Sequence, residues 1–290
     1  MKFLSKKLKS SFSIFVENPL LFLIAGFFLV TVFPIYSPLV ERFTARDSYY
    51  SHGFLIPFIT IYLIWRKRGH LKSIQPVTSM TGLFLLISGL FVFIVSRFFV
   101  VNFVSYLGSL IALFGIILFL FGWRLVKEIF LPLAFLIFML PLPSIVVIGI
   151  TFKMKMIASI ISSYLANMIG IQAEVSGSKI LYPGGSLLVG DPCSGLRSMI
   201  SFLALGAFLI QVINTSILKK ILIFISVMPI AILSNVMRIL VLTVVCYIYG
   251  DHLADGLLHD ATGIMVFIVG FIGLMFVLKV LKCQISIESV

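Results

Sequence analysis

The stretch VGDPCSGLRS, residues 189–198, places a cysteine and an arginine four residues apart, directly before a long apolar run. Pro192 is expected to end an outer segment, and Ser194 with the next glycine to begin a helix, so Cys193 would lie at or next to the N-cap. The positive end of a helix dipole favours a thiolate, and Arg197 adds a charge one turn later. Cys193 is therefore a candidate nucleophile. The alternative is a loop cysteine beside an arginine that extends to the membrane surface.

An arginine and an asparagine lie inside another apolar run, residues 221–249. Arg238 is 11 residues before Tyr249, where the run ends, so about 16 Å of helix separates them. An arginine this deep is costly unless it faces a wet or paired site, so a functional role is expected. Asn235 lies one turn earlier and can orient it. A structural ion pair is the alternative, although the acidic residues all fall in predicted outer segments or cytoplasmic loops.

Histidines on the same predicted side complete a set of reactive groups. His259, with Asp260 beside it, directly precedes the last apolar run, whereas His252 is farther from that run and is expected to be solvated. His52, near the outer end of another predicted helix, is a further candidate. A thiolate, an arginine and a histidine are the groups that acyl transfer uses as nucleophile, oxyanion stabiliser and proton shuttle. Spacing along the chain does not show that they meet.

The remaining cysteines and histidines do not predict a redox or metal site. Cys246 and Cys283 form no CxxC pair, so they are interpreted as small apolar fillers. A zinc site from His252, His259 and Asp255 would lack the usual ligand pattern. We therefore predict no metal and no cofactor.

Composition defines the class of protein. Of 290 residues, 61% are hydrophobic and 11% are charged, which is far outside the range of soluble domains and predicts an all-α polytopic membrane protein. The net charge of +12 does not indicate nucleic acid, because most Lys and Arg residues form short clusters between apolar runs.

Apolar runs of sufficient length predict about eight transmembrane helices in a single integral membrane domain over residues 1–290. The first run is long and ends in FPIYSPLV, which predicts an uncleaved helix and not a signal peptide. The second run is the weakest. The predicted spans are residues 20–40, 48–65, 80–96, 98–122, 129–150, 197–217, 221–249 and 263–281.

Charge asymmetry predicts the orientation. With the N-terminus inside, 14 of the 22 basic residues fall on the inner side with 3 acidic residues, and the outer side has 8 basic and 7 acidic residues. The positive-inside rule therefore places both termini in the cytoplasm and Cys193 on the outer face.

Residues 152–192 form the sizeable extramembrane element that we predict. Residues 152–170 have one apolar stripe opposite a face of serines and an asparagine, which predicts an amphipathic helix lying on the outer face. If this helix spanned the membrane, Lys219 and Lys220 would lie outside. The alternation and turn residues that follow, SGS and YPGG, predict two or three short strands as a β-hairpin segment.

Together these patterns resemble the exosortase/archaeosortase transpeptidases of bacteria and archaea. The three family motifs, Cys-Ser-Gly-x-Arg, Asn-x-x-Arg and His-x-x-x-Gly, match CSGLR (193–197), NVMR (235–238) and HDATG (259–263) in the same order. Two further stretches, at 50–65 and 135–143, are similar to family hallmarks. The resemblance covers roughly residues 45–270.

This resemblance implies a mechanism and a substrate class. Cys193 would be the nucleophile, Arg238 the transition-state stabiliser and His259 the general acid/base, with Arg197 binding a substrate carboxylate or tuning the thiol. The substrates would be exported proteins with a C-terminal recognition motif such as Pro-Glu-Pro, one hydrophobic helix and a basic end. The product would pass from a cysteine thioester to an amine or membrane-lipid acceptor at the outer face of the inner membrane. The Gly-Asp-Pro sequence directly before Cys193 differs from the residues that usually precede this cysteine in the family, so the subfamily is not assigned.

Two rival functions remain. A multi-span transporter or scaffold with an incidental cysteine would predict paired intramembrane charges or repeat symmetry, and the sequence has neither. A hydrolytic intramembrane cysteine protease differs only in the acceptor, so the sequence does not separate it from a transpeptidase. No nucleic-acid partner is predicted, and the sequence gives no oligomeric state.

Overall fold

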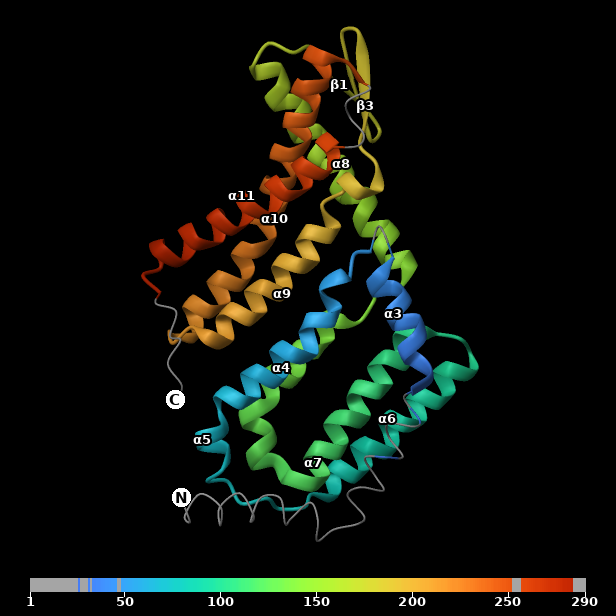
Figure 1. The fold of residues 1–290 in the computed structure, drawn as a ribbon, viewed down its shortest axis with the longest axis vertical. Coiled ribbons are helices and arrows are strands. Elements are labelled where there is room, and N and C mark those ends of the chain that lie inside the picture. The colour runs from blue at the N-terminus through green and yellow to red at the C-terminus, as the bar shows by residue number, and fades with distance from the viewer. Residues whose placement is uncertain (1–25, 27–30, 32, 46–47, 252–256, 284–290) are drawn as a thin grey trace. The chain divides into compact units, whose positions relative to one another are not determined.

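The computed structural model describes residues 26, 31, 33–45, 48–251 and 257–283 (Figure 1). Most of the first predicted span, 20–40, lies outside this part of the chain. The described residues form two compact units. One contains the chain up to Thr44 together with Leu55–Pro141, and the other contains Ala45–Phe54 and the chain from Leu142 onward.

Helices dominate both units. The first unit contains the 3-10 helix η1 (Phe33–Ile35), α3 (Tyr36–Thr44), α4 (Leu55–Arg66), α5 (Arg68–Leu71), α6 (Met80–Phe98), α7 (Asn102–Ala134) and the 3-10 helix η3 (Phe135–Met139). The second contains η2 (Ser51–Phe54), α8 (Ser144–Met168), β1 (Glu174–Ser176), β2 (Lys179–Tyr182), β3 (Gly185–Leu188), η4 (Asp191–Cys193), α9 (Leu196–Val212), α10 (Ile217–Tyr249) and α11 (Leu257–Val280).

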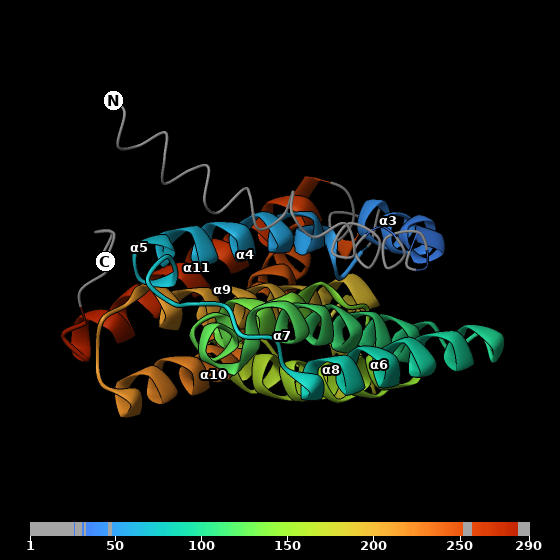
Figure 2. The ribbon, with the colours of Figure 1, turned by 90° about the horizontal axis from the view of Figure 1, so that it is seen from below.

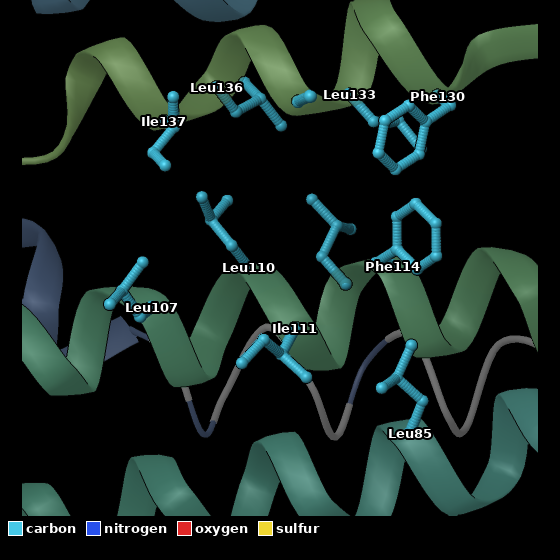
Figure 3. A pocket seen from close by; sticks show the side chains of 11 residues that line it. Leu85, Leu107, Leu110, Ile111, Phe114, Phe130, Leu133, Leu136 and Ile137 are labelled. Carbon is cyan, nitrogen blue, oxygen red and sulfur yellow. The ribbon is translucent and has the colours of Figure 1, made fainter.

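Helix α7 is not one straight helix but a hairpin of two helical segments joined at Gly122, which we call its first and second legs. In a continuous helix Phe114 and Phe130 would lie about 24 Å apart, but their ring centroids are 5.9 Å apart. Figure 3 shows the apolar side chains of the two legs facing each other. The reversal occurs at Gly122, whose φ is +74°. A side chain there would also meet the carbonyl oxygen of Val77, so this position requires glycine.

Glycines bring α6 against the first leg of α7. A Cβ added at any of them would meet backbone atoms of the facing helix, so the two backbones are in direct contact. This is the close approach that small residues permit between membrane helices. The pairs are Gly82 with Phe119, Gly89 with Ala112, Gly108 with Phe93, and Gly115 with Leu86.

Six described helical segments are long and apolar enough to cross a membrane, which confirms a multi-pass helical protein but not the predicted total of eight spans. The predicted span 48–65 is instead the short η2 followed by the 12-residue α4, which is shorter than the roughly 17 residues that a span needs. The six segments are Met80–Phe98, Asn102–Met139, Ser144–Met168, Asp191–Val212, Ile217–Tyr249 and Ala261–Val280.

The boundary predicted between the span 129–150 and an outer-face helix at 152–170 is wrong, because α8 runs without interruption across it. The polar face of α8 is also turned inward. The hydroxyl of Ser162 donates to the carbonyl of Val236 in α10 at 3.0 Å. Small polar residues commonly join membrane helices, so this face indicates a protein neighbour. Buried on it are Ser159, Ser162 and Ser163, and more than half exposed on the other side are Ile160 and Tyr164.

A small antiparallel sheet, in the order β1-β2-β3, confirms the predicted strands. Its inner face buries Ile180, Tyr182 and Leu187 in a cluster with residues of α8 and α10. Beyond β3, the backbone N–H of Val189 donates to Ser178 O at 2.9 Å, and the chain then enters η4. In the same unit, α10 packs against both α9 and α11 (Figure 2). The sheet therefore leads the chain directly to Cys193.

Candidate functional site

Cys193 is the last residue of the 3-10 turn η4 and is 7% exposed. Helix α9 begins at Leu196, with Gly195 as its N-cap at φ +80°. The helix therefore starts where the sequence predicted, but Cys193 lies two residues before the N-cap and not at or next to it. The left-handed backbone of Gly195 separates η4 from α9.

Asn235 of α10 contacts the segment that carries the cysteine. Its Nδ2 donates to the carbonyl of Cys193 at 3.0 Å, and the residue is 1% exposed. A Cβ added to Gly195 would lie 2.6 Å from Cγ of Asn235, so this close contact needs glycine as well as the left-handed turn. Within the part of the chain that the structure describes, Oδ1 of Asn235 is buried without a hydrogen-bond partner.

Arg238 joins three segments of the chain. Its Nη1 donates to the carbonyl of Pro192 at 3.2 Å, and its Nε donates to the hydroxyl of Thr262 in α11 at 3.3 Å. A Cβ added to Gly263 would lie 3.8 Å from Nη2, so that glycine lies against the guanidinium. Arg238 is 7% exposed. The structure thus brings together residues of all three sequence motifs.

The histidine of the third motif is placed only along the chain. His259 and Asp260 belong to α11, and His259 precedes Thr262 by three residues. Their side chains, and all of His252 and Asp255, lie outside the described residues. Among the residues that the structure does describe, no group of three or more His, Cys, Asp or Glu side chains is arranged to hold a metal ion.

The other candidates lie on α9 or against it. Arg197 lies half-buried in the first turn of α9. Ser201, one turn later, has its Oγ 3.4 Å from Nδ1 of His52, so His52 packs against the helix beyond Arg197. The hydroxyl of Ser194, which is buried, accepts the backbone N–H of Leu196 at 3.4 Å.

Sequence reasoning missed an ion pair beside the cysteine. Nζ of Lys155 in α8 lies 2.7 Å from Oδ1 of Asp191, the first residue of η4. The Lys155 side chain is only 16% exposed, so this pair connects η4 to α8. The partners are 36 positions apart in the sequence, and nothing in the sequence signalled their contact. Thr262, which accepts from Arg238, was missed for the same reason.

Residues 44–276 match the protein-family model described as Transmembrane exosortase (Exosortase_EpsH). No curated protein and no solved structure matches the chain. The matched range contains all three motifs and every element from α4 to η4, α9 and α10, together with most of α11.

Proposed function

Because the chain belongs to the transmembrane exosortase family, we propose that it is a cysteine transpeptidase that cleaves a C-terminal sorting signal from exported proteins. Family membership makes it a membrane-embedded sorting enzyme that acts on exported proteins. The thioester on Cys193, the identity of the signal and the roles of the side chains are our proposal.

One observation carries the proposal: α10 binds the main-chain carbonyls on both sides of Cys193. Arg238 binds the carbonyl of Pro192, and Asn235 binds the carbonyl of Cys193. Arg238 also binds Thr262, one turn of α11 after His259. Segments 24 to 46 residues apart along the chain are therefore joined to the backbone that carries Cys193, and this convergence supports acyl transfer better than an incidental cysteine in a transporter or scaffold.

In the proposed reaction the Cys193 thiolate attacks the scissile carbonyl carbon. The carbon–sulfur bond forms, and Arg238 stabilises the charge on the carbonyl oxygen. The carbon–nitrogen bond then breaks, and His259 gives a proton to the departing amine. An incoming amine, free or on a membrane lipid headgroup, attacks the thioester, His259 takes its proton, and the thiolate is released.

The supporting residues bind and orient. We assign Arg197, in the first turn of α9, to an acidic side chain of the recognition motif, because a guanidinium pairs well with a carboxylate. Asp260 would orient the imidazole of His259. Ser194 fixes the start of α9, and His52 holds α9 one turn beyond Arg197. No step of the proposed reaction uses a cofactor.

We place the site at the outer face of the inner membrane, with both termini in the cytoplasm, because basic residues concentrate on the other predicted side. The test uses variants with a single cysteine and a maleimide that does not cross membranes. Leu188→Cys, at a position that is 66% exposed, should be labelled in intact cells, and Cys283 should be labelled only after lysis. The reverse pattern would invert the topology.

Processing of a tail-bearing protein from the same genome tests the function directly. Co-expression with the native enzyme should remove the tail, and Cys193→Ala should leave the tail intact. Mass spectrometry of the new C-terminus separates transfer, which gives an amide or other adduct, from hydrolysis, which gives a free carboxylate. Processing by the Cys193→Ala variant would disprove the proposal. If no tail-bearing protein is processed, the transporter or scaffold becomes the better explanation.

A further inference from the structure

The carboxylate of Asp251 holds the β2–β3 turn at the end of α10. Its Oδ1 accepts the hydroxyl of Tyr182 at 2.5 Å, and its Oδ2 accepts the backbone N–H of Ser186 at 3.0 Å. A Cβ added to Gly185 would meet both carboxylate oxygens, so the carboxylate rests on the backbone of the turn. We call these four residues, Tyr182, Gly185, Ser186 and Asp251, the Asp251 clamp.

The chemistry of the clamp favours a firm connection. Burial and the hydrogen bond with Asp251 raise the pKa of Tyr182 well above its usual range, so the phenol remains a donor even at a pH where an unfolded tyrosine ionises. Hydrogen bonds to an ionised carboxylate are shorter and roughly twice as strong as neutral ones. The edge of Tyr247 also packs against the Tyr182 ring, with centroids 6.2 Å apart.

The clamp joins the two chain segments that lead to the proposed reacting groups. From Ser186 the chain reaches Cys193 in seven residues, and from Asp251 it reaches His259 in eight. The Asp251 carboxylate therefore connects the segment that leads to Cys193 with the segment that leads to His259. The two segments have similar lengths.

The segment between the clamp and the cysteine is held at both ends by residues that lie on or directly after α10. Asp251 binds Ser186 at the start of the segment, and Arg238 binds the carbonyl of Pro192 at its end. Between these ends, the backbone N–H of Val189 donates to Ser178 O and Lys155 pairs with Asp191. Because the segment is short, the place of Ser186 affects where the following residues lie. Loss of Asp251 should therefore shift the strand that leads to Cys193.

We propose that Asp251 is a positioning residue for the reaction: through Tyr182 and Ser186 it fixes the place of Cys193 relative to the start of α11. The inference rests on the proposed function, in which His259 exchanges a proton within the Cys193 site. A misplacement of a reacting group by about 1 Å can lower a catalytic rate about 100-fold. A small shift of Cys193 after the loss of Asp251 is therefore sufficient to lower the rate.

Disulfide trapping measures the position of Cys193 without using activity. The full chain in its membrane carries His259→Cys, with Cys246→Ala and Cys283→Ala to remove the other thiols. A mild oxidant should join Cys193 to the new cysteine rapidly, and Asp251→Ala should slow the reaction about 10-fold or more. Equal rates would overturn the clamp and leave the proposed function intact. No disulfide in either protein would contradict the meeting of Cys193 with position 259, and so both proposals.

Tail processing by the native sequence provides the second readout. Asp251→Ala should lower kcat about 10- to 100-fold with little change in KM, and Asp251→Asn, which keeps an acceptor for the phenol, should recover part of the loss. Gly185→Ala should reproduce the effect because its methyl group displaces the carboxylate. Gly149→Ala, which meets nothing within 4 Å, is the matched control. Unchanged kcat, or a loss confined to thermal stability, would overturn the inference.

Discussion

One helix pair in each unit shows a different kind of contact. In the first unit, α6 and the first leg of α7 meet on glycines, backbone against backbone, with one pair of serines at 2.9 Å near the end, Ser96 and Ser105. In the second unit, α10 is joined to α8 and η4 by side chains that donate to main-chain carbonyls. Ser162 binds Val236 and Asn235 binds Cys193.

The difference shows where chemistry can be placed inside a membrane. Glycine contacts give close packing but leave no reactive group at the interface. Hydrogen-bonded contacts keep polar side chains inside membrane helices, where polar groups are costly and are therefore usually functional. Arg238 illustrates this, because the same side chain that binds Pro192 and Thr262 is the proposed catalytic group. The candidate site is thus part of the packing of the second unit.

The largest effect should come from Arg238→Lys. A lysine keeps the charge but lacks the planar fork that reaches Pro192 and Thr262 together. Loss of a transition-state donor lowers kcat by about 10²- to 10³-fold, so tail processing should fall by that amount while the protein remains inserted. Arg97→Lys, in the first unit, is the control and should process normally. Full processing by Arg238→Lys would remove its catalytic role.

Gly115→Ala should have the next largest effect, and it acts on the other unit. The new methyl group would meet the backbone of Leu86, and overpacking of this kind destabilises a protein by about 1–3 kcal/mol. Thermal unfolding in detergent should show a lower Tm, with disulfide trapping between Cys193 and position 259 unchanged. An unchanged Tm would show that α6 and α7 can separate freely, against the glycine packing described above.

Ser162→Ala tests a single hydrogen bond between α8 and α10. Bonds of this kind between membrane helices contribute about 0.6 kcal/mol on average, so the expected loss of stability is smaller than for Gly115→Ala. The control is Ser88→Ala, because the Ser88 hydroxyl bonds only within its own helix, to Leu85. Equal stabilities of the two variants would contradict a structural role for the polar face of α8.

The smallest effect is a pH dependence that comes from Tyr182. Its pKa is raised in the folded protein, whereas an unfolded tyrosine ionises near pH 10. The stability that it contributes is therefore complete below about pH 10 and is lost as the pH rises further. The stability difference between the native protein and Tyr182→Phe should be constant from pH 7 to 9 and shrink by about 0.4 kcal/mol at pH 10. A difference that grows with pH would contradict this sign.

Hydropathy and local motifs predicted much of this arrangement. The apolar runs at 80–96 and 221–249 correspond to α6 and to most of α10, and the strands fall where turn residues placed them. The sequence also selected Cys193, Asn235 and Arg238, which the structure brings together. These features depend on the residue composition of a short stretch of the chain or on a charge that is costly to bury. Both can be recognised from the amino-acid sequence alone.

The features that the sequence did not predict depend on the identity of the neighbour. The serines of α8 were expected to face water, but they are buried, and Ser162 binds α10 while Ser163 binds the carbonyl of Ala173. A small polar side chain in a membrane helix can face either water or a neighbouring segment of protein. Lys155 with Asp191 and Tyr182 with Asp251 are contacts between distant segments, and no local pattern specifies them. The predicted spans 98–122 and 129–150 placed a connection after Gly122, but they did not predict that the chain reverses within that one residue.

That reversal has a practical consequence for anyone who tags this protein. Gly122 turns the chain within one residue, and the carbonyl of Val77 occupies the space beside it, so there is no loop to receive an inserted epitope or fluorescent protein. The basic residues that follow, Arg124 and Lys127, make this place look like an ordinary cytoplasmic connection in a hydropathy plot. A reporter fused there would force apart the two legs, which pack against each other at Phe114 and Phe130, and topology reporters should be placed elsewhere.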